Sequence, residues 1–148
     1  MKFPSTHLSL APHEDSLWES LKGLSGVYVM VIVNGEKAPV SSDSLAPHVE
    51  LALRRSGIRI VQKEKVGHKY PTITLLVAVG TLGNAFTVSA YAIESVVSSE
   101  SRYILMTGVS IWWTDSLNIG VTSGHILDVV KSTVDVFAND YLKANPKK

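Results

Sequence analysis

The chain of 148 residues contains no cysteine, and charged residues make up only 18% of it. Without cysteine, the sequence excludes disulfide bonds, cysteine-ligated zinc, iron–sulfur clusters and thiol catalysis. The 14 basic and 13 acidic residues leave a net charge of +1, and no cluster of Lys or Arg indicates a nucleic-acid surface. The apolar fraction of 45% is too high for a disordered chain, and the length fits one domain with a substantial core.

One segment lacks charge altogether, because there is no Asp, Glu, Lys or Arg from Tyr70 to Ile93. A run of this length could cross a bilayer. However, Gly80, Gly83 and Asn84 interrupt it near its middle, and the residues on either side are β-branched and apolar. The pattern therefore favours a hairpin, with strands at roughly 72–80 and 86–97, over a membrane span.

The N-terminal region has a single lysine and no apolar run of the length that a signal peptide needs. We expect either a cytoplasmic protein, or a periplasmic or secreted one from which a signal peptide has been removed. Residues 1–13 are predicted to be a flexible arm, residues 14–145 a single α/β domain, and residues 146–148 a tail.

A strand, a helix and a second strand are predicted before the charge-free segment. Residues 27–33 are apolar on both faces, which is typical of a central strand. A helix is predicted from Leu45 to Arg55, with Ser44 as its N-cap and Gly57 as its C-cap. Residues 58–62 are predicted to be the next strand, so the two strands should be parallel with a right-handed crossover.

The hairpin is followed by a last predicted strand from Tyr103 to Trp113 and a loop from Asp115 to Thr122, which complete an antiparallel meander. A final helix begins at Ser123, its predicted N-cap, and its core-facing residues recur at steps of three and four. These residues are Ile126, Val130, Thr133, Val134, Phe137 and Tyr141. The sequence therefore predicts an α/β (α+β) fold: a single two-layer domain with a mixed sheet of about five strands, in which a βαβ unit precedes the meander and the C-terminal helix packs on the sheet.

No pattern in the sequence indicates catalysis, a metal site or a cofactor. The five histidines are scattered, and no two are separated by one helical turn. Ser123, His125 and Asp128 begin one helix, where residues two apart do not face each other, so they do not form a triad. We therefore predict no catalytic residue, no metal and no cofactor, and a protein that is not an enzyme.

The neighbouring residues Trp112 and Trp113 are the most conspicuous candidates for a binding surface. Successive residues of a strand point to opposite faces, so one ring should enter the core and the other should emerge on the far side of the sheet. With Tyr91 and Tyr103, they are the predicted partner-binding residues. The first hypothesis is a non-enzymatic binding or assembly protein, a subunit or self-associating module that uses an apolar sheet face to bind a protein partner or another copy of itself. The alternative is a small-ligand carrier or weak enzyme, with a pocket between the last helix and the meander lined by Tyr91, Tyr103 and Trp113.

Three segments of the chain, at residues 14–29, 49–58 and 134–147, resemble a group of small, usually secreted bacterial α/β proteins of uncharacterised function. The last segment is the most specific, with the pattern Phe-x-Asn-Asp-Tyr-Leu-x-Ala-Asn-Pro-Lys from Phe137 to Lys147. The resemblance implies export to the periplasm or beyond, and it brings no catalytic residues with it. The order of strands and helices is also loosely similar to the N-terminal domain of the periplasmic protein TolB, a likeness of fold that implies no function.

Overall fold

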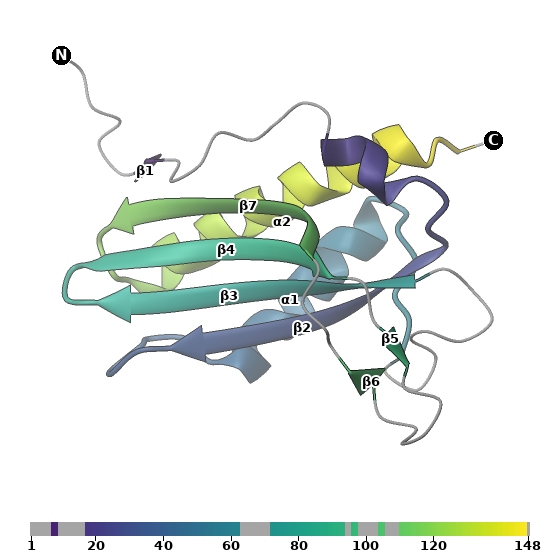
Figure 1. Ribbon diagram of the computed structural model, residues 1–148. Coiled ribbons are helices and arrows are strands. Elements are labelled where there is room, and N and C mark those ends of the chain that lie inside the picture. The colour runs from purple at the N-terminus through teal and green to yellow at the C-terminus, as the bar shows by residue number, and fades with distance from the viewer. Residues whose placement is uncertain are drawn as a thin grey trace, which may run out of the picture.

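The computed structural model describes residues 7–8, 17–62, 72–93, 96–97, 104–105 and 110–147. Its strands are β1 (His7–Leu8), β2 (Gly26–Asn34), β3 (Thr72–Leu82), β4 (Ala85–Ile93), β5 (Val96–Val97), β6 (Ile104–Leu105) and β7 (Ser110–Ile119). Its helices are the short 3-10 helix η1 (Leu17–Leu21) and the α-helices α1 (Ser42–Arg55) and α2 (Ser123–Ala144). Figure 1 shows the main sheet with both α-helices behind it.

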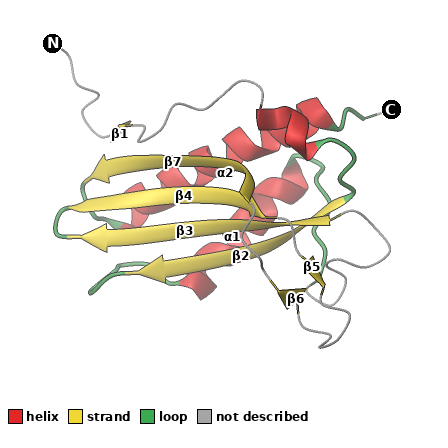
Figure 2. Cartoon of the chain, viewed as in Figure 1, coloured by secondary structure: helices red, strands yellow, loops and turns green. Residues whose placement is uncertain are grey.

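The main sheet has the strand order β1-β7-β4-β3-β2. β2 runs parallel to β3, from Gly26 opposite Thr72 to Asn34 opposite Gly80, and the other neighbouring strands are antiparallel. Both α-helices lie on the same face of this sheet (Figure 2). The predicted class, an α/β domain with a mixed sheet and a C-terminal helix, is confirmed. The sheet itself consists of four long strands and the two-residue β1, so the prediction of about five strands is slightly off in that only four of them are of ordinary length.

The core lies between the sheet and the two α-helices. The predicted stripe of α2 is confirmed, because its six residues are all buried. Thr122 is the N-cap of α2 in place of the predicted Ser123, and the Thr122 side chain accepts a hydrogen bond from the His125 N–H. Neither α-helix in the described part of the chain combines the length and the apolar character that crossing a membrane requires. The largest fully buried side chains are those of Trp112, Phe86, Phe137, Leu21, Leu45, Leu53, Ile73, Leu75 and Ile126.

The two ends of α1 lie close to the predicted ones. Ser41 is the N-cap in place of Ser44: the Ser41 side chain accepts from the Ser44 N–H at 3.1 Å, and the Ser44 side chain accepts from the Ser41 N–H at 3.0 Å. This reciprocal pair is a capping box. Ser44 takes part in the cap as its third helical residue, which explains why the sequence pattern favoured Ser44 as the N-cap. At the other end Ser56 is the C-cap, and Gly57 follows it with a left-handed φ of 84°, which glycine adopts without strain.

The prediction that residues 58–62 form the second strand of a βαβ unit is wrong. Residues 58–62 make one isolated parallel bridge, between Val27 and Ile60, and the parallel neighbour of β2 is β3. The Ile58 N–H is already used by the end of α1, because it donates to the Leu53 carbonyl at 3.0 Å. The segment is therefore tied to the helix and meets β2 at a single point.

β3 and β4 confirm the predicted hairpin, but the last strand lies later in the chain than predicted. β7 ends at Ile119, so most of the expected loop from Asp115 to Thr122 is strand paired with β4. This part of β7 is polar because Ser116 and Asn118 face α2 at positions where an apolar residue would be expected, and both are buried. Because these two residues are polar, the sequence pattern indicated a loop at this point and not a strand.

The predicted arm and tail are described only in part. Of residues 1–13, the structure describes β1, which pairs with β7 through His7 opposite Asn118 and Leu8 opposite Leu117. Of residues 146–148, Lys148 lies outside the described residues.

Candidate functional site

The two neighbouring tryptophans lie on opposite faces of β7. Trp112 is fully buried beneath α2, whereas Trp113 is half-buried on the other face. The Trp112 Nε1–H donates to Asp140 Oδ2 at 2.8 Å, and its ring meets that of Phe137 edge-on, with the centroids 5.1 Å apart. Trp112 is therefore a core residue held by α2, which corrects its predicted place in the binding surface.

We define the open face as the side of the sheet opposite α1 and α2. On this face the register aligns one side chain from each of four strands. Met30 lies opposite Leu76, and Leu76 lies opposite Tyr91. Tyr91 in turn lies opposite Trp113. All four are half-buried, and directly opposed residues of neighbouring strands are close enough to pack; we call these four residues the open-face row.

The open-face row joins two of the predicted partner-binding residues, Tyr91 and Trp113. A third, Tyr103, lies outside the described residues. Figure 1 shows neither of the described α-helices on this side of the sheet. The row therefore presents apolar and aromatic surface that α1 and α2 leave uncovered.

The open face also carries little charge. Asp115 is the one charged residue in the four long strands β2, β3, β4 and β7. Toward the ends of the strands, Ile32, Ile119 and Leu82 add apolar surface, with exposed fractions of 38%, 50% and 86%. An apolar surface depleted in charge is typical of the centre of a protein interface.

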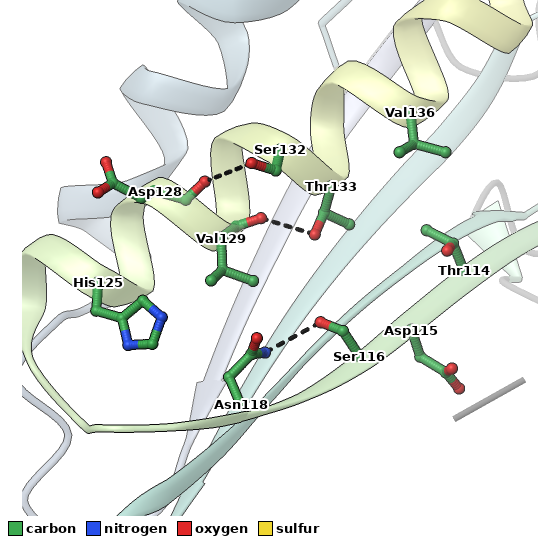
Figure 3. A pocket seen from close by; sticks show the side chains of 10 residues that line it. All are labelled: Thr114, Asp115, Ser116, Asn118, His125, Asp128, Val129, Ser132, Thr133 and Val136. Carbon is green, nitrogen blue, oxygen red and sulfur yellow. Dashed lines mark hydrogen bonds between the residues drawn. The ribbon is translucent and has the colours of Figure 1, made fainter. Parts of the chain in front are cut away.

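A cleft of about 480 Å³ opens on the other side of the sheet, between β7 and α2 (Figure 3). The predicted pocket between the last helix and the meander therefore has a counterpart in the structure. Two of its predicted lining residues are wrong, because Tyr91 and Trp113 belong to the open face, whereas residues of β7 and α2 line the cleft. The third, Tyr103, lies outside the described residues. The lining residues are Thr114, Asp115, Ser116, Asn118, His125, Asp128, Val129, Ser132, Thr133 and Val136.

Polar side chains line much of this cleft. Asn118 is fully buried, and its Nδ2 donates to Ser116 Oγ at 3.0 Å. His125 Nδ1 lies 2.9 Å from the carbonyl oxygen of Gly120, so this nitrogen carries the proton in that contact, since a carbonyl only accepts. None of the ten lining residues is Lys or Arg, so the cleft offers no cationic side chain to an anionic ligand.

The geometry offers no catalytic assignment. His125 is engaged with the Gly120 carbonyl, and within the described ranges no group of His, Asp and Glu side chains is placed to hold a metal ion. Sequence reasoning missed the polar side of the cleft. The signal was the alternation of small polar residues at Thr114, Ser116 and Asn118, which marks one face of a strand.

Comparison with known proteins gave structural matches but no sequence family. No family model matches the chain, and no curated protein matches it. The chain is similar to the PelC dodecamer from Paraburkholderia phytofirmans, with 16% identity and a TM-score of 0.48 over 92% of this chain and 96% of that chain. It is also similar to a point variant of the same dodecamer, with 17% identity and a TM-score of 0.48 over 92% of this chain and 98% of that chain. At this level of similarity, the function of the chain has to be inferred from its own residues.

Proposed function

We propose that the chain is a non-enzymatic binding and assembly protein whose open face packs against the open face of a second copy. The observation that supports this most strongly is the open-face row, which sets Tyr91 opposite Trp113 on an apolar surface that α1 and α2 leave uncovered. Tyrosine and tryptophan are enriched among the residues that dominate interface energies. The structure thus offers a surface suited to protein contact.

Two properties favour a second copy as the partner. Sheets pack face to face at about 10 Å through apolar side chains. The open faces of two copies both present such side chains to each other. Repulsion between copies is small, because Asp115 is the one charged residue of the long strands and the net charge is +1. A twofold arrangement buries both open-face rows at once.

Replacement of Trp113 by lysine tests this proposal. The variant Trp113→Lys places a charge in the middle of the proposed contact, and loss of an interface tryptophan weakens association by about 2 kcal/mol or more, roughly thirtyfold. Light scattering over a range of concentrations should show the native chain above its monomer mass. The variant should stay at the monomer mass at concentrations where the native chain is associated.

Leu51→Lys is the matched control, because Leu51 is an exposed residue of α1, on the side of the molecule away from the open face. This variant should associate like the native chain, and circular dichroism should show all three proteins folded. A native chain that stays monomeric at every concentration, or equal association of both variants, would contradict the proposal.

The cleft between β7 and α2 supports a second candidate function, that of a small-ligand carrier. The observation that favours it is the buried polar pair Asn118–Ser116 inside a space of about 480 Å³, since ligand sites combine such a volume with a few placed polar groups.

Ser132→Trp would fill the mouth of the cleft, and Lys131→Trp adds the same ring at an exposed neighbour that does not line it. A nuclear magnetic resonance screen of small neutral and cationic compounds should find some that shift the Asn118 side-chain amide signals. Those shifts should disappear in Ser132→Trp and persist in Lys131→Trp. If no compound moves these signals, the carrier function is wrong.

A further inference from the structure

The outer edge of β2 carries hydrogen-bonding groups that the described chain uses only at its start. β2 is the last strand in the sheet order, and in Figure 1 no further long strand lies beside it. Near its beginning, the Val27 N–H donates to the Arg59 carbonyl and the Val27 carbonyl accepts from the Val61 N–H, both at 2.9 Å. The N–H and C=O of Val27 therefore point outward, away from β3.

Backbone groups alternate in direction along a strand, so those of Val29, Val31 and Val33 also point outward. No strand pairs with these three residues in the part of the chain that the structure describes. Backbone N–H and C=O groups at an open sheet edge are a ready template for another strand. The β2 edge therefore has three consecutive positions at which a strand can add.

The strand β2 itself carries none of the sequence features with which proteins usually protect an edge. Its nine residues, Gly-Val-Tyr-Val-Met-Val-Ile-Val-Asn, include no charged residue and no proline, and its register with β3 is regular along its whole length. Lysine, proline and bulges are the common devices that stop edge strands from pairing. By contrast, β1 covers part of the opposite edge, at β7.

We infer that this edge is an interaction surface on which β2 of a second copy pairs antiparallel to β2 across a twofold axis at Val31. In this register Val31 faces its own counterpart, and Val29 faces Val33 of the second copy. All three outward positions are then used, which gives about six hydrogen bonds between the copies. A shift of the axis to Met30 or Ile32 would leave one of the three positions unpaired.

The side chains of β2 support a second copy as the occupant. In the same register Met30 of each copy lies opposite Ile32 of the other on the open face, and Ile32 is 38% exposed in the single chain. On the opposite side of the sheet Val31 meets Val31, which is half-buried. Directly opposed apolar pairs of this kind stabilise antiparallel strands, and a strand without charge meets no like charge in its own copy.

This contact does not rest on the proposed function, because it uses the edge of the sheet and not its open face. It would, however, join the open faces of two copies into one surface. The row that begins at Trp113 and ends at Met30 would continue through Ile32 of the second copy. The inferred pairing thus makes a larger apolar surface from two chains.

The absence of cysteine allows a direct test by disulfide cross-linking. Opposed residues of a hydrogen-bonded antiparallel pair have Cα atoms about 5.5 Å apart, within the range that a disulfide spans. The single variant Val31→Cys should therefore form a covalent dimer under mild oxidation, seen on a non-reducing gel at twice the chain mass. Val33→Cys is the matched control: it lies on the same strand and face, but two copies of it are separated by about 13 Å along the paired strands and should not cross-link.

A third variant separates edge pairing from chance collision. Adding Ile32→Lys to Val31→Cys places a charge opposite Met30 of the second copy and should abolish the cross-link, whereas Leu82→Lys, at the distant hairpin turn, should leave it intact. Adding Trp113→Lys should also leave it intact, so failure of the open-face proposal does not affect this result. Equal cross-linking of Val31→Cys and Val33→Cys, or none from Val31→Cys, would overturn the inference.

Discussion

Tyr141 links the C-terminal helix to the segment before β2. Its side chain is 6% exposed, and its hydroxyl donates to the Leu24 carbonyl at 2.9 Å. Burial removes water from the ring and raises the pKa of Tyr141 above its ordinary value of 10.0, because the charged phenolate is poorly solvated there. The folded chain therefore holds this proton more tightly than the unfolded chain does.

This difference predicts a loss of stability at high pH. Below pH 10 both states are protonated at Tyr141, and above pH 10 the unfolded chain releases the proton first, so the free energy of unfolding falls as the pH rises toward the folded pKa. The variant Tyr141→Phe should lack this part of the decline. Urea unfolding at pH 8 and pH 11 measures it for both proteins.

Tyr28→Phe is the control, because Tyr28 is a half-buried tyrosine on the open face. It should show the same fall in unfolding free energy as the native chain. If Tyr141→Phe also shows that fall, the buried hydroxyl has no special part in the pH dependence.

At the start of α1, the sequence predicted the buried side of the helix correctly but not the residue that caps it. The pattern of Leu45, Val49 and Leu53 predicted the buried side of the helix, and all three residues are buried. The N-cap was displaced by one turn, because Ser41 and Ser44 form one reciprocal unit. Periodicity predicts which side of a helix is buried, whereas the cap depends on the dihedral angles of a single residue.

Replacement of each serine tells the two roles apart. Ser41→Ala removes the acceptor for the Ser44 N–H and should lower the free energy of unfolding by about 1 kcal/mol. Ser44→Ala removes the acceptor for the Ser41 N–H and the donor to the Ser41 carbonyl, but it leaves the Ser44 N–H capped and should therefore cost less. Ser42→Ala serves as a neighbouring control with little effect. Chemical unfolding measures all three. A larger loss for Ser44→Ala than for Ser41→Ala would place the cap at Ser44.

At the scale of the whole molecule, the layers and the C-terminal helix were predictable, and the pairing of β2 was not. Apolar runs mark strands, but they do not say which strands are neighbours. β3 and residues 58–62 lie on opposite sides of β2, where β3 pairs along its whole length and residues 58–62, whose Ile58 N–H bonds to the end of α1, make a single bridge.

The candidate site was predictable to a similar extent. Alternation requires that Trp112 and Trp113 face opposite sides, yet the helix contact at Asp140 decides which one is buried. That contact joins residues far apart in the sequence. The cleft was placed between the correct elements, and its polar lining was missed because Ser116 and Asn118 resembled a loop.

The parallel pairing of β2 with β3 also has a consequence for how the chain folds. The turn between β3 and β4 brings together Leu82 and Ala85, which are near neighbours in the sequence, whereas β2 reaches β3 only when Gly26 meets Thr72 across α1 and everything between them. Contacts between distant residues close more slowly, because more chain entropy is lost before any bond forms. We expect the β3–β4 hairpin to form early and β2 to pair with β3 late. The pairing of β2 should therefore limit the rate of folding.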